Sequence, residues 1–78
     1  MFYLALVNET KGTLTVNPDI AEIDGGCEVW PDQESARARF ECMGLQAEIN
    51  NMGRNPNAPK GDVWSAYMGD KPWEAPNA

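Results

Sequence analysis

The fold is decided by residues 31–52, which read PDQESARARFECMGLQAEINNM. Asp32 can accept hydrogen bonds from the free amides of a first helical turn, and Glu34 suits the positive end of the helix dipole. Apolar residues then recur at helical spacing. The stretch therefore predicts one long helix that starts at Pro31-Asp32 and ends at about Asn51.

Apolar residues form two stripes on opposite sides of this helix when each residue turns through about 100°. The first stripe is Ala36, Phe40, Met43 and Ala47, and the second stripe is Ala38, Cys42, Leu45, Ile49 and Met52. We expect the first stripe to face a sheet and the second to be covered by the C-terminal residues, although the reverse assignment is equally compatible with the spacing. Gly44 lies between the stripes and costs about 1 kcal/mol of helix stability relative to Ala. It marks either the close approach of another backbone or a merely tolerated glycine.

Two strands are predicted at the start of the chain. Phe2–Val7 is apolar on both of its alternating faces, as in a strand that is covered on both sides. Thr13–Val16 alternates between polar and apolar, with Leu14 and Val16 inward, and the turn residues 8–12 precede it. Together these segments predict a hairpin.

A second hairpin is predicted before the helix. Gly25 and Gly26 suit a tight turn with positive φ, and Ile20–Asp24 and Cys27–Trp30 flank them. The alternative for residues 18–24 is a short helical turn. The chain therefore predicts an α+β fold in which a small antiparallel sheet of three or four strands packs on one long helix.

The composition shifts to Gly, Pro and Asn from residue 53 onward, which predicts a connector over 53–61. We expect a short helix over Val63–Met68, because Trp64, Tyr67 and Met68 share a helical spacing. Residues 1–52 would then form the compact core of a single domain, with 53–78 as an irregular tail packed on it. The aromatic residues of this tail serve either as a lid over the second stripe or as an anchor inserted into another protein.

Charge is the other distinctive feature of the 78 residues, which carry a net charge of -6. Between residues 19 and 34 there is no Lys or Arg, and the carboxylates there are Asp19, Glu22, Asp24, Glu28, Asp32 and Glu34. We expect them to point outward wherever Ile20, Ile23, Val29 and Trp30 point inward, which would create a negative ridge. Such a surface repels phosphate, so direct binding to nucleic acid or to an anionic membrane is not expected.

Catalysis and metal binding are not expected, because the chain has no histidine and only two cysteines. Cys27 and Cys42 are read as small buried residues, with a disulfide as the alternative. Asp24-Gly25 does not complete a calcium loop, since Ile20 would occupy its first ligand position. No cofactor is expected. The apolar opening 1–7 is too short for a signal sequence or a membrane span, which favours a cytoplasmic location.

The sequence therefore predicts a small inhibitor or modulator that binds a larger protein with a basic surface, for instance one in a nucleic-acid-binding complex, so that carboxylates mimic phosphates. In size, acidity, low cysteine content and sheet-plus-helix layout, the chain resembles small phage-encoded inhibitors of host systems, anti-CRISPR proteins among them. The alternative is a structural or scaffold protein, for instance a homodimer, that self-associates through the second stripe and the tail. The partner-binding candidates are Asp19, Glu22, Asp24, Glu28, Asp32, Glu34, Trp64, Tyr67 and Trp73.

Overall fold

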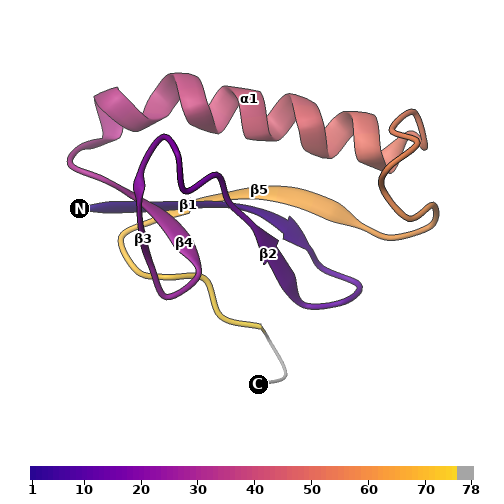
Figure 1. Cartoon of the computed structure of the whole chain (residues 1–78), viewed down its shortest axis with the longest axis horizontal. Helices are drawn as coiled ribbons and strands as arrows, with labels where there is room; N and C mark the ends of the chain where they lie inside the picture. The colour runs from indigo at the N-terminus through magenta and orange to yellow at the C-terminus, as the bar shows by residue number, and fades with distance from the viewer. Residues whose placement is uncertain (76–78) are drawn as a thin grey trace.

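A curled antiparallel sheet packs against one long helix in the computed structural model, which describes residues 1–75 (Figure 1). The elements are β1 (Phe2–Asn8), β2 (Thr13–Thr15), β3 (Glu22–Asp24), β4 (Cys27–Trp30), α1 (Gln33–Asn51) and β5 (Trp64–Gly69). The predicted α+β class is confirmed, and so are the two predicted hairpins.

The central strand of the sheet is β1. Along one edge it pairs with β5 from Tyr3 to Asn8. Its other edge is shared, because β4 pairs with Phe2 to Leu4 and β2 pairs with Leu6 to Asn8. The sheet is extended beyond β4 by β3, so β3 and β5 lie at opposite edges.

Both faces of β1 are buried, as its two apolar faces predict. Leu4 lies on the face under α1, in a cluster with Ala36 and Met43. Ala5 and Val7 lie on the other face with Cys27; Tyr3, Leu14, Val16, Tyr67 and Trp73 pack around that cluster. One strand therefore carries the two halves of the core.

The hairpin from β3 to β4 is closed by Gly25 and Gly26, whose φ angles are 60° and 81°. Two successive residues with positive φ are what a type I′ turn requires, and its twist matches that of the flanking strands. Within 18–24, a turn at 18–20 leads into β3, so the alternative of a short helical segment there is wrong.

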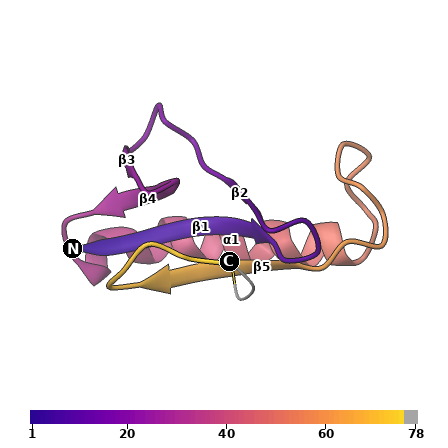
Figure 2. The ribbon, with the colours of Figure 1, turned by 90° about the horizontal axis from the view of Figure 1, so that it is seen from below.

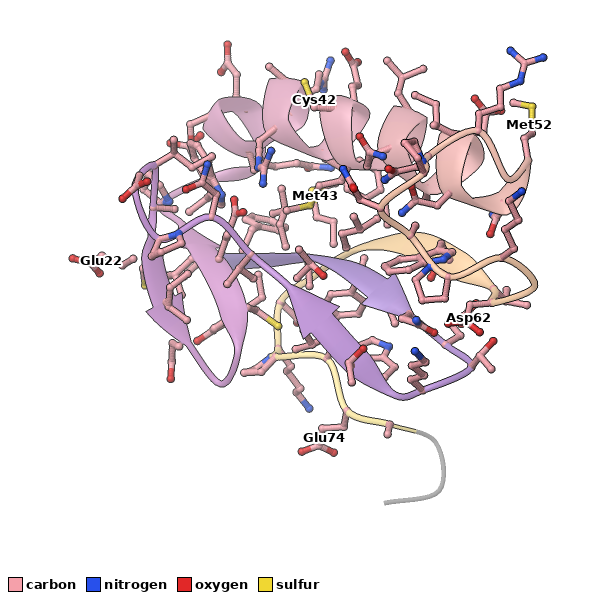
Figure 3. The ribbon with its side chains drawn as sticks, turned by 45° about the vertical axis from the view of Figure 1, so that its right-hand side comes forward. Glu22, Cys42, Met43, Met52, Asp62 and Glu74 are labelled. Atoms are coloured by element: carbon pink, nitrogen blue, oxygen red, sulfur yellow. The ribbon has the colours of Figure 1, made fainter. Side chains whose placement is uncertain are left out.

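The helix starts as predicted. The Asp32 Oδ1 accepts a hydrogen bond of 2.7 Å from the amide of Ser35. Ala36, Met43 and Ala47 of the first stripe are buried against the sheet, and Phe40 packs beside them. Figure 3 shows Met43 between the helix and the sheet and Cys42 on the outer side. The first stripe therefore faces the sheet.

The predictions for the C-terminal segment are wrong in two respects. Residues 64–69 form β5 instead of a short helix, because all six residues pair with β1 in a continuous register, whereas an isolated helix of that length is marginal. Tyr67 consequently lies on the face opposite to Trp64 and Met68. The segment also leaves the second stripe uncovered, since Leu45 is 61% and Met52 57% exposed.

Candidate protein-binding surface

The predicted acidic residues lie around the β3–β4 hairpin and the first turn of α1. These two elements occupy the same end of the molecule in both ribbon views (Figures 1 and 2). Figure 3 shows Glu22 projecting away from the sheet. Five carboxylates of the segment are exposed, and we call them the acidic face: Asp19, Glu22, Asp24, Asp32 and Glu34.

The sixth carboxylate, Glu28, does not belong to this surface, and its assignment as a partner-binding residue in an outward-facing ridge is wrong. Its exposure is 0%, because β4 lies between β1 and β3 in the sheet. Arg39 of α1 holds it with bonds of 3.0 Å from Nε to Oε1 and 2.8 Å from Nη2 to Oε2. The Asn17 amide donates to Oε2 at 3.0 Å, and Trp30 Nε1 is 3.4 Å from Oε1.

This arrangement keeps Glu28 ionised. Burial on its own raises the pKa of the carboxyl. The hydrogen bonds from Arg39 and the Asn17 amide, the charge of Arg39 and the Trp30 bond outweigh burial, so the net pKa lies below its ordinary value of 4.5. The pair joins the sheet to the helix and has a structural role. The role of Arg39 was not predicted, although the sequence contains a signal for such a pair: Glu28 is the only charged residue in the short apolar segment Cys27–Trp30.

Two isoleucines accompany the acidic face. Ile20 is 47% and Ile23 41% exposed, so the expectation that they point inward is wrong. The reason is that β3 is a three-residue edge strand with no element packed on it, and all of its residues are exposed. Along β3 the side chains alternate, so Ile23 lies on the face of the strand opposite to Glu22 and Asp24, and the hairpin exposes carboxylates on one face and an aliphatic side chain on the other.

Neither of the ion pairs found in residues 1–75 neutralises the acidic face. One is Glu28–Arg39 and the other joins Lys11 to Asp62 at 3.8 Å. Asp24 accepts a hydrogen bond of 3.3 Å from the hydroxyl of Tyr3, and Asp32 caps the helix. The cap bonds from Ser35 lower the pKa of Asp32. No carboxylate of the acidic face is therefore paired with a Lys or Arg side chain of residues 1–75.

The three aromatic candidates are distributed over the fold. Trp64 lies beside Asn51, whose side chain bonds to both its backbone N–H and its C=O, at the far end of α1 from Asp32. Tyr67 donates to the Lys71 carbonyl at 2.6 Å, and Trp73 packs on the cluster of Ala5 and Val7. All three are half-buried, and Tyr67 and Trp73 pack on the core cluster of Ala5, Val7 and Cys27. They do not join the acidic face in a single site.

A shallow groove of about 330 Å³ lies near the C-terminal end of α1, and none of the five carboxylates of the acidic face lines it. No charged side chain lines it; its walls are Leu6, Thr15, Gln46, Asn50, Asn55, Asn57, Ala58, Pro59 and Trp64. The amides largely bond one another, since Asn50 Oδ1 accepts from both Gln46 and Asn55. The indole N–H of Trp64 has no partner in the described chain, but it is inaccessible to solvent and so cannot meet a ligand there. The groove offers neither an acid–base pair nor a nucleophile.

The two cysteines are unpaired: Cys27 is buried and Cys42 is exposed on the second stripe. The expectation of burial is therefore right for Cys27 alone. Across residues 1–75, no three potential metal-ligating side chains cluster. No helix in the same range has the length and apolar character needed to cross a membrane. Comparisons with known protein families, with characterised proteins and with solved structures find no match to this chain.

Proposed function

We propose that this protein is a binding module that inhibits or modulates a larger protein by placing the acidic face against a basic site. The observation that carries the proposal is that five exposed carboxylates gather at one end of the fold, and neither ion pair of residues 1–75 involves them. A partner that supplies Lys or Arg side chains would complement this surface.

The expected partner is a protein whose basic site normally holds nucleic acid. Carboxylates on a protruding hairpin can stand where phosphates would, and opposite charge accelerates association and excludes wrong partners. We propose a binding role and not an enzymatic one, since the acidic face has no base, nucleophile or metal cage within it.

The test uses two variants of equal net charge. D19N/E22Q/D24N removes three charges from the acidic face, and E9Q/E41Q/E48Q removes three exposed charges elsewhere, so each changes the net charge from -6 to -3. Wild-type protein and both variants are immobilised and exposed to a lysate of the source cell at increasing salt. Bound proteins are then challenged with a DNA oligonucleotide.

The proposal requires a retained protein that the acidic-face variant loses and the control variant keeps. Its release should be steeply salt-dependent, because the Debye length falls from about 10 Å at 0.1 M salt to about 3 Å at 1 M. Displacement by DNA would identify the occupied site as a nucleic-acid site. Equal retention by both variants would refute the electrostatic basis of the proposal.

Self-association through the second stripe is a second candidate, favoured by the exposure of Leu45 and Met52. It would make the protein a scaffold component. The charged variant Leu45→Lys tests this candidate directly, because it places a charge on the second stripe.

A further inference from the structure

The outer edge of β5 has unpaired backbone groups. The side chain of Asn51 forms hydrogen bonds with both the N–H and the C=O of Trp64, whereas the Val63 carbonyl accepts a hydrogen bond from the Glu9 amide. The backbone groups of successive residues in this segment therefore point alternately away from β1 and toward it. By this alternation the N–H and C=O of Ala66 and Met68 point outward. They have no hydrogen-bond partner among residues 1–75. Figure 2 shows β5 along one border of the ribbon, with α1 behind β1 and β5.

This edge also has none of the usual protection against pairing. Natural edge strands are shortened, or carry Lys, Pro or a bulge, because an open edge is a template for another strand. The β5 sequence WSAYMG is six residues long and contains no charge and no proline. Its register with β1 is continuous over all six residues, without a bulge.

Gly44, on the side of α1 above β5, is a second and independent feature that points to a contact there. A glycine inside a helix is destabilising relative to Ala, and here a Cβ would meet nothing within 4 Å. The isolated chain therefore gives no reason for it. Gly44 lies seven residues before Asn51, which is two helical turns less about 20°, so it is on the β5 side of α1. Arg39, which reaches Glu28 in β4, marks the opposite side.

Gly44 and the centre of the open β5 edge lie at the same position along the direction of the strands. From Trp64 to Tyr67 the strand advances about 10 Å, and from Asn51 back to Gly44 the helix covers about 10.5 Å. Because Asn51 and Trp64 are bonded to each other and the two elements run in opposite directions (Figure 1), Gly44 is level with Tyr67.

We propose that two copies of this chain form a two-fold symmetric dimer in which β5 pairs antiparallel with β5 of the second copy, centred on Tyr67. Ala66 and Met68 of each copy then exchange hydrogen bonds with Met68 and Ala66 of the other. The two Tyr67 side chains become a cross-strand aromatic pair. A two-fold contact of this kind is self-complementary, so one edge suffices for both copies.

The helices fit this arrangement. With α1 over β1 and β5 and strands about 4.8 Å apart, the two helix axes would be about 10 Å apart, within the usual packing distance of about 8–10 Å. Gly44 then lies where the helices pass each other. The charged residues of that side, Arg37, Glu41 and Glu48, turn further from the sheet and lie at the rim. The acidic face stays free, since β3 is at the opposite edge of the sheet, and the dimer would present two copies of it.

Sedimentation equilibrium of the full chain over a wide concentration range tests the dimer. We expect the mass to rise toward twice 8.6 kDa with concentration. Ala66→Pro removes an outward N–H that the ladder with β1 does not use, and Gly44→Lys places a long side chain at the helix contact. Each should abolish the dimer, and Gly44→Lys should leave the monomer at least as thermally stable as wild type, because its Cβ enters open space.

The neighbouring substitution Leu45→Lys is the matched control, because Leu45 is exposed on the second stripe and points away from β5. It should leave the association unchanged. Hydrogen exchange should show protection of the Ala66 and Met68 amides that grows with concentration. The proposal is overturned by a monomer at millimolar concentration, by a dimer that survives both Ala66→Pro and Gly44→Lys, or by a dimer that only Leu45→Lys dissociates.

Discussion

Glu28 and Arg39 form an ion pair that connects the sheet to the helix. A carboxylate with 0% exposure is stable only because its oxygens accept bonds from Arg39, Asn17 and Trp30. Glu28→Gln keeps the shape and removes the charge, which leaves the guanidinium without its counter-charge. Arg39 is 27% exposed and can reach some water, so we expect a loss of about 2 kcal/mol of unfolding free energy, less than for a fully buried pair.

The pH dependence distinguishes this effect from a loss of packing. The pKa of Glu28 is lower in the folded protein than its ordinary value of 4.5, so its stabilisation is fully present above pH 4.5 and is lost as the pH falls through the folded value. Denaturant titrations of wild type and Glu28→Gln should therefore differ most at pH 7 and converge in acid. A difference that stays constant between pH 7 and pH 3 would contradict the assignment.

At the residue scale, the sequence did not predict which individual side chains are buried. The Asp32 cap was predictable, because its interaction with Ser35 is local. Glu28 lies among carboxylates that are all exposed, and only the non-local position of β4 between β1 and β3 buries it. The prediction that Ile20 and Ile23 point inward was wrong for the converse reason, because no other element covers the short edge strand.

At the scale of elements, the orientation of α1 can be tested with two helix positions. Met43 has 2% exposure and contacts the cluster of Leu4, whereas Leu45 is 61% exposed. Met43→Ala should cost about 3 kcal/mol through lost burial and the cavity left behind, and Leu45→Ala should change stability by less than about 0.5 kcal/mol. Chemical denaturation monitored by far-UV circular dichroism measures both. Equal effects would mean that the second stripe is also packed.

The structure of residues 64–69 was also decided by an interaction between elements, which is why β5 was not predicted. Trp64, Tyr67 and Met68 have a spacing compatible with a helix, and six residues are too few for periodicity to decide. The strand conformation is determined by β1, because residues 64–69 pair along its otherwise free edge from Tyr3 to Asn8. The two apolar faces of Phe2–Val7 predicted a covered strand correctly, but they did not say which segment would pair with it.

At the scale of the whole molecule, both halves of the core meet on β1. Leu4 faces α1, and Ala5 and Val7 face the cluster around Cys27, on which Trp73 packs. A domain of this size has only about 4 to 12 kcal/mol of stability, so neither half is expected to persist without the other. The segment after β5 is then part of the cooperative unit, although it contains no regular element between Asp70 and Ala75.

Trp73→Ala tests this coupling across the sheet. Trp73 is half-buried, and its backbone N–H lies 3.4 Å from Cys27 Sγ, so we expect a loss of about 2 kcal/mol, below the range for a fully buried tryptophan. The helix signal and the fluorescence of the remaining tryptophans should shift together in a single transition, because β1 belongs to both clusters. The neighbouring variant Glu74→Ala, at an exposed position, should melt like wild type. If the helix kept its wild-type transition while the fluorescence changed, the two faces of β1 would be independent and the tail would not stabilise the helix-bearing half of the core.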